Sequence, residues 1–200
     1  MATHRTLLPG TVFPALSLAK VGGGSLDLKP AEGRHLLVVA YRGFFCPLCQ
    51  GTLQDVQGKL DKLQDAGIDV VAISAEPLDV AEKTAADWGV TFPVGAGLKG
   101  KRRPAAGEGA QADLRTLGLY VSDPRHYQPI DWRFGEPGWF LVSPDGKIQY
   151  VDVASTPVGG RVNVDHLLFA TKWVQQRLVE HPEFAGYVWG GVPAAEGGEA

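Results

Sequence analysis

The chain contains two cysteines, Cys46 and Cys49, in the run Cys46-Pro47-Leu48-Cys49. Cysteines at this spacing serve as a redox-active dithiol, as half of a zinc site, or as two inert core thiols. A zinc site needs two further ligands, and the five histidines show no His-x(3–5)-His pair. The pair follows an apolar run and opens a helical pattern, and this context favours redox chemistry over the other two uses.

The two thiols occupy different places on the predicted helix. Cys46 lies at the cap position, where free backbone N–H groups and the positive end of the helix dipole favour a thiolate. Pro47 fits the first turn, because an amide N–H there has no partner inside the helix. Cys49 lies one turn further along the same face. We therefore expect Cys46 to be the more exposed, nucleophilic thiol and Cys49 to be the shielded, resolving thiol with the higher pKa.

The elements that position this pair can be read from the hydrophobic pattern. Residues 35–41 form a continuous apolar run, which predicts a strand buried on both faces. Apolar residues then recur at steps of three and four, which predicts a helix that begins at Cys46 and ends before Gly67. The other predicted elements are a hairpin in 16–28, a strand at 68–73, helices at 78–88 and 110–117, a hairpin in 139–153, and a helix at 164–178 with Asn163 as its N-cap.

This order of elements predicts an α/β fold. A right-handed β-α-β unit followed by an antiparallel hairpin and a closing helix gives a mixed central sheet with helices on both faces. That is the layout of a thioredoxin-like fold. We expect one domain over residues 1–193, with an insertion and loop region at 95–135 and a frayed tail at 194–200.

Composition and charge exclude several classes of function. The 200 residues carry a net charge of −3, so no overall positive field attracts nucleic acid or an anionic membrane. The longest apolar run is far shorter than the roughly 20 residues that span a bilayer. Since no apolar stretch precedes Pro9, we expect a cytoplasmic protein. Basic residues around 99–103 indicate either a solvated loop or a site for an anionic partner.

A second candidate part of the site is Glu136-Pro137, just before the strand predicted from Trp139. Proline is accepted in a sheet at the start or edge of a strand. In thioredoxin-like proteins this place holds a cis-proline that faces the disulfide, and an ordinary trans turn proline is the alternative. Glu136 is the nearby carboxylate that we expect to accept a proton from Cys49.

The segment at 41–49, Tyr-Arg-Gly-Phe-Phe-Cys-Pro-Leu-Cys, resembles the active site of peroxiredoxin-like proteins of the alkyl hydroperoxide reductase/thiol-specific antioxidant family. Residues 138–146 and 157–159 are similar to the second half of that family, and the likeness covers about residues 7–178. It implies an antioxidant thiol oxidoreductase that needs no metal and no bound cofactor.

The chain departs from the family pattern at three places. Typical members carry Pro-x-x-x-Thr-x-x-Cys, whereas Val39 and Gly43 occupy the Pro and Thr positions here. The family's arginine that polarises the peroxide aligns with Pro137. Arg42 and Arg133 are the candidates to replace it, and the alternative for each is an ordinary surface arginine.

These observations predict a thiol-based oxidoreductase. Cys46 attacks a disulfide or a peroxide, and Cys49 resolves the product into an internal disulfide. The alternatives are a genuine peroxidase for hydrogen peroxide or alkyl hydroperoxides, and a non-catalytic redox-sensing module that acts through the 95–109 loop. The expected partners are a thioredoxin-like or glutathione-type thiol reductant and, because family members often dimerise, a second copy of the chain.

Overall fold

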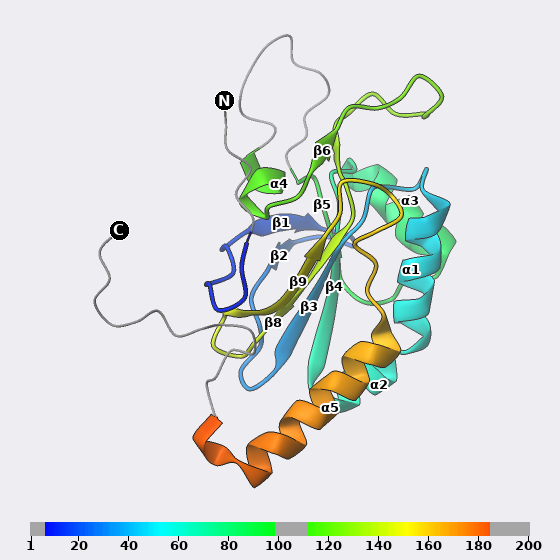
Figure 1. Ribbon diagram of the computed structural model, residues 1–200. Coiled ribbons are helices and arrows are strands. Elements are labelled where there is room, and N and C mark those ends of the chain that lie inside the picture. Colours follow the sequence, from blue (N-terminus) through cyan, green and yellow to red (C-terminus); the bar gives the residue numbers. More distant parts are fainter. Residues whose placement is uncertain (1–6, 99–111, 185–200) are drawn as a thin grey trace, which may run out of the picture.

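The fold is known from a computed structural model that describes residues 7–98 and 112–184 (Figure 1). Its elements, in chain order, are β1 (Ser17–Lys20), β2 (Ser25–Asp27), β3 (His35–Ala40), α1 (Pro47–Gly58), α2 (Leu60–Asp65), β4 (Ile68–Ile73), α3 (Leu78–Trp88), β5 (Val94–Ala96), α4 (Ala112–Thr116), β6 (Val121–Ser122), β7 (Phe134–Gly135), β8 (Gly138–Val142), β9 (Ile148–Val153), α5 (Val164–Glu180) and the short 3₁₀ helix η2 (Pro182–Phe184).

The described strands form one large mixed sheet and one small antiparallel pair. The large sheet has the order β2-β1-β5-β4-β3-β8-β9, and β6 pairs with β7. Strands β3, β4 and β5 run parallel, whereas β8 and β9 are antiparallel to their neighbours. The predicted α/β thioredoxin-like architecture with a mixed central sheet is confirmed.

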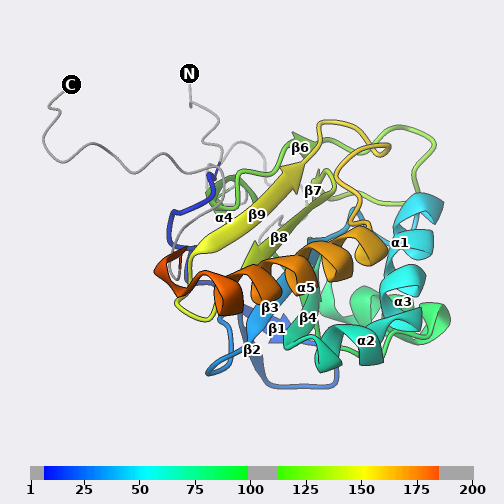
Figure 2. The same cartoon turned by 60° about the horizontal axis from the view of Figure 1, so that its bottom comes forward.

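Both faces of the sheet are covered. Side chains alternate along a strand, so Leu37 and Val39 of β3 enter one core while Leu36 and Val38 enter the other. This double burial explains the continuous apolar run. Helices α1, α2, α3 and α5 contribute to the first core, and Figure 2 shows α5 lying across the sheet. Helix α4 contributes to the second core.

Two elements of the structure differ from the prediction: the helix after Cys46 and the segment at residues 95–96. The helix that follows Cys46 is two helices, because the backbone leaves helical geometry at Lys59 (φ −118°, ψ 12°), directly after Gly58. Residues 95 and 96, predicted as loop, belong to strand β5. A Cβ at Gly95 would lie 2.8 Å from the Leu18 side chain, so glycine there lets β1 pack closely on β5.

The predicted insertion contributes to the core. Its described residues include six buried apolar side chains of the second core: Leu98, Leu114, Leu117, Leu119, Trp132 and Phe134. The basic segment at 99–103 and the tail at 194–200 lie outside the described residues. Within the described ranges, the helices are too short or too polar to cross a membrane.

Candidate active site

The dithiol begins helix α1 as the sequence predicts. Cys46 is the N-cap, with extended backbone angles (φ −108°, ψ 102°), and Pro47 follows in the first turn. The Cys49 amide donates a hydrogen bond to the Cys46 carbonyl at 3.0 Å. In the described ranges, no cluster of three His, Cys, Asp or Glu side chains is arranged as a metal site.

Strand register brings three distant segments to the dithiol. Ala40 of β3 pairs with Gly138 of β8, and Gly138 pairs with Val153 of β9. The chain that follows Ala40, the chain that precedes Gly138 and the chain that follows Val153 therefore leave the sheet at the same edge. These are the segments of the cysteines, of Glu136-Pro137, and of Arg161.

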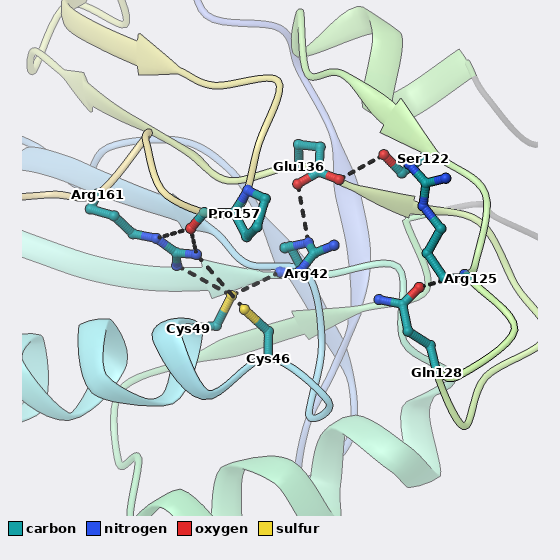
Figure 3. A network of polar contacts seen from close by, with 9 residues as sticks. All are labelled: Arg42, Cys46, Cys49, Ser122, Arg125, Gln128, Glu136, Pro157 and Arg161. Atoms are coloured by element: carbon teal, nitrogen blue, oxygen red, sulfur yellow. Dashed lines mark hydrogen bonds and ion pairs between the residues drawn. The ribbon is translucent and has the colours of Figure 1, made fainter.

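The Arg161 guanidinium contacts both sulfur atoms (Figure 3). Its Nη1 donates to Cys49 Sγ at 3.2 Å, and its Nη2 lies 3.8 Å from Cys46 Sγ. The Pro157 carbonyl accepts hydrogen bonds from Nε at 3.1 Å and from Nη2 at 2.5 Å, which fixes the plane of the guanidinium. Sequence reasoning missed Arg161, although it follows the family-like segment 157–159 by two residues.

Both thiols are buried, with 2% of Cys46 and 0% of Cys49 exposed. Cys46 is thus the more exposed of the two, as expected, but by a small margin only. The cap position alone leaves a side chain open to solvent, but the loop that carries Arg161 closes over the start of α1. A reagent or substrate must enter a confined space to reach the Cys46 sulfur.

Pro137 contacts the segment between β9 and Arg161, but its peptide bond differs from the one predicted. The peptide bond before Pro137 is trans, so the expected cis-proline is wrong. The chain passes from β7 into β8 without a turn, and an extended trans peptide suits that path. The Pro137 carbonyl accepts a hydrogen bond from Ala154 N at 3.0 Å, and a Cβ at Gly160 would lie 2.3 Å from the same oxygen.

Arg42 lies on the other side of the dithiol. Its backbone N–H donates to Cys49 Sγ at 3.4 Å, and its Nε forms an ion pair with Glu136 Oε2 at 3.1 Å. The guanidinium carbon lies 5.4 Å and 4.7 Å from the ring centroids of Phe45 and Phe134. These contacts hold a partly buried cation beside the cysteines, so of the two candidate arginines Arg42 joins the site.

Glu136 and Arg133 occupy other positions. Glu136 is buried, and its Oε1 accepts a hydrogen bond from the Ser122 hydroxyl at 2.6 Å. Figure 3 shows Arg42 between Glu136 and the sulfur atoms, so Glu136 reaches the dithiol through Arg42. Arg133 pairs with Asp123 at 2.7 Å, with 46% of its side chain exposed, and we assign it no role in the site.

These surroundings separate the acidities of the two thiols. The pKa of Cys46 is lowered to about 5, because its sulfur receives hydrogen bonds from the Cys49 thiol and backbone and is stabilised by Arg42 and Arg161, although burial opposes this. Burial and the neighbouring Cys46 raise the pKa of Cys49, against the influence of Arg161. This difference favours the thiolate form for Cys46 and the protonated form for Cys49 in the reduced pair.

The model of the AhpC/TSA family matches residues 9–151. The chain belongs to the AhpC/TSA family. It is 24% identical over 153 residues to an alkyl hydroperoxide reductase C of Staphylococcus saprophyticus, an alignment that covers 72% of this chain and 69% of that protein. As a member of this family, the protein is a thiol-based oxidoreductase of the peroxiredoxin class.

Solved structures share the fold of this AhpC/TSA protein at low sequence identity. Mycobacterium tuberculosis AhpC superposes with a TM-score of 0.65 and 17% identity, over 86% of this chain and 94% of that one. Peroxiredoxin Q of Xanthomonas campestris gives a TM-score of 0.58 and 23% identity, over 85% and 98% of the two chains.

Alkylation of the reduced protein tests the separation of the two thiols. Because the thiolate is the reacting form and the Cys46 pKa is depressed, the reactivity of Cys46 toward iodoacetamide should fall as the pH drops through about 5 and be level near neutrality. An ordinary thiol titrates near about 8.5. Peptide mapping should find Cys46 modified first, with urea-unfolded protein as the control. A midpoint above pH 8, or Cys49 modified first, contradicts the assignment.

Replacement of Arg161 tests its effect on the thiolate. Arg161→Met should raise the alkylation midpoint of Cys46 by about one pH unit, because a buried thiolate loses its facing cation. Arg161→Lys should fall between this variant and wild type, since an ammonium lacks the planar fork that reaches both sulfurs and the Pro157 carbonyl. Arg133→Met, which removes an exposed arginine, is the matched control. An unchanged midpoint in Arg161→Met refutes the role.

A pair of glycine variants tests the packing of the loop. Gly160→Ala places a methyl group against the Pro137 carbonyl and should cost about 2 kcal/mol of unfolding free energy while slowing Cys46 alkylation. Gly22→Ala is the control, because Gly22 also has positive φ but has open space around its Cβ position. Chemical denaturation and alkylation rates measure both effects. Equal alkylation rates in the two variants contradict the packing account.

Proposed function

We propose that the protein is a two-cysteine thiol peroxidase that reduces hydrogen peroxide or small alkyl hydroperoxides, with Cys46 as the peroxide-reacting thiol and Cys49 as the resolving thiol. The observation that carries this proposal is a buried Cys46 thiol with a pKa of about 5 beside the Arg161 guanidinium. A small peroxide fits a site in which 2% of the nucleophile is exposed, whereas a protein disulfide is much larger.

The proposed reaction has two chemical steps. The Cys46 thiolate attacks one oxygen of ROOH, the O–O bond breaks, and RO⁻ leaves and takes up a proton to become ROH. Cys46 is oxidised to a sulfenic acid as the peroxide is reduced. The Cys49 sulfur, after losing its proton, then attacks the Cys46 sulfur, water leaves, and the two residues form a disulfide.

The leaving oxygen develops negative charge and needs a positively charged or hydrogen-bonding neighbour. Pro137 stands where the resemblance places the arginine that does this in other members. We assign the role to Arg161, which approaches the dithiol from a different segment. Arg42 supplies a second, partly buried cation, held in place by Glu136 and two aromatic rings.

Thiol–disulfide exchange with a protein is the second candidate activity, and one observation favours it. Phe44 and Leu48, which flank Cys46 in the sequence, are 39% and 51% exposed and give the start of α1 an apolar rim. Such a rim suits contact with another protein. The redox-sensing alternative rests on the 95–109 loop, of which 99–109 lie outside the described residues.

The catalytic cycle needs a reductant for the disulfide. Peroxiredoxins use thioredoxin-like reductants and often form dimers. We propose a thioredoxin-like dithiol protein, with a glutathione-type thiol as the alternative, and a homodimer as the assembly. We place the enzyme in the cytoplasm, where such reductants keep thiols reduced.

Stopped-flow oxidation of the reduced protein tests this proposal. Wild type should react rapidly with hydrogen peroxide and form an internal disulfide. Cys46→Ser should abolish the reaction, whereas Cys49→Ser should consume one equivalent to form a sulfenic acid on Cys46, which a second equivalent over-oxidises to a sulfinic acid. Mass spectrometry identifies each product. Slow reaction with peroxide together with brisk reduction of insulin disulfides would instead establish the exchange activity.

A further inference from the structure

A second carboxylate lies beneath the segment that leads to Cys46. Glu76 follows strand β4 and is fully buried, with 0% of its surface exposed. Because β3 and β4 run parallel, the residues after their last positions leave the sheet at the same edge, so Glu76 lies under residues 41–45. The cysteine motif and the family resemblance give no indication of this residue.

Hydrogen-bond donors lie against both carboxylate oxygens of Glu76. Oε1 accepts from the Phe44 backbone N–H at 2.7 Å, and it lies 3.1 Å from the Thr84 hydroxyl, whose one proton also has the Val80 carbonyl as an acceptor at 2.9 Å. Oε2 accepts from the Tyr41 hydroxyl at 2.6 Å and from the Ser74 hydroxyl at 3.2 Å. A buried carboxylate is unfavourable unless hydrogen-bond donors surround it, and the donors around Glu76 meet this requirement.

The four donors divide into two groups. Tyr41 and Phe44 belong to the segment between β3 and Cys46. Ser74 directly follows β4, and Thr84 belongs to α3. Hydrogen bonds to a carboxylate are shorter and stronger than those between neutral groups, and the two shortest here are those to the Cys46 segment. Glu76 therefore ties the approach to Cys46 to the rigid part of the fold.

The backbone of the same segment depends on this carboxylate. The Tyr41 amide donates to the Ile73 carbonyl, and the Cys46 amide donates to the Gly43 carbonyl. For the Phe44 amide the partner is the Glu76 side chain. Gly43 has φ +140°, and a Cβ there would lie 3.3 Å from Glu76 Oε1, so the carboxylate packs directly against the backbone three residues before Cys46.

We propose that Glu76 is a positioning residue that holds residues 41–45 in the conformation that places the Cys46 sulfur at the start of α1 and within reach of Arg161. The proposal deepens the proposed function, since it rests on Cys46 being the nucleophile. Glu76 acts through Tyr41 and the Phe44 amide and does not touch the reacting atoms.

Two hydroxyl deletions on the same carboxylate provide a matched test. Tyr41→Phe removes a donor that belongs to the Cys46 segment, and Thr84→Val removes a donor that belongs to α3. The rate constants of Cys46 with iodoacetamide and with hydrogen peroxide are measured at pH 7 for each variant. Tyr41→Phe should lower both by about fivefold or more, because small displacements of a reacting group cost large factors in rate. Thr84→Val should stay within about twofold of wild type.

Glu76 itself is tested by two substitutions. Glu76→Gln keeps an oxygen for the Phe44 amide, and the hydroxyls of Tyr41 and Ser74 can rotate to accept from the new amide, so this variant should retain most of the reactivity. Glu76→Leu should lose about tenfold or more, since both contacts to the segment disappear. If Glu76→Leu does not fold, the Tyr41 and Thr84 pair decides.

Equal effects of Tyr41→Phe and Thr84→Val on the Cys46 rate constants, or no effect of either, would overturn the proposal and leave Glu76 a purely structural group. The iodoacetamide measurement does not depend on the natural substrate. If wild type fails to react with peroxide while the alkylation rates still separate the two variants, the proposed function fails and the positioning role of Glu76 stands.

Discussion

The contact between the Arg161 guanidinium and the two sulfur atoms is the interaction on which the chemistry of this fold depends. A buried thiolate is unfavourable unless opposite charge or hydrogen-bond donors face it. Arg161 provides both, and the Pro157 carbonyl holds it in place. It acts together with the Cys49 thiol, the Cys49 backbone and Arg42, which also lower the pKa of Cys46. These groups together favour the thiolate form of Cys46 at neutral pH.

Sheet topology explains how a residue 115 positions after Cys46 comes to face it. The β3, β8 and β9 strands are neighbours, and the register places Ala40, Gly138 and Val153 in line. The loops at that edge consequently meet over the start of α1. The parallel neighbour β4 brings Glu76 to the same edge. The cysteine segment is thus contacted from the β4 side by Glu76, at the Phe44 amide, and from the β9 side by Arg161, at the sulfur atoms.

The sequence was sufficient for the architecture and for the position of the two cysteines at the start of α1, since both depend on local patterns. The apolar run before Cys46, the proline at the first turn and the side chain of Asn163, which accepts from the His166 amide at 3.0 Å, each act over a few residues. Arg161 and Glu76 depend on strand order instead. A single arginine in a glycine-rich loop, or a glutamate before a proline, carries no local signal of what it faces. The burial of Cys46 was missed for the same reason, because the covering loop is distant in sequence.

Separate titration of the two thiols by NMR, with carbon-13 at the cysteine Cβ atoms, tests the central claim most directly. The reduced protein should show the Cys46 Cβ shift changing with a midpoint near pH 5, while the Cys49 shift stays constant up to at least about pH 9. Two similar midpoints near the ordinary thiol value, or a lower midpoint for Cys49, would contradict the account.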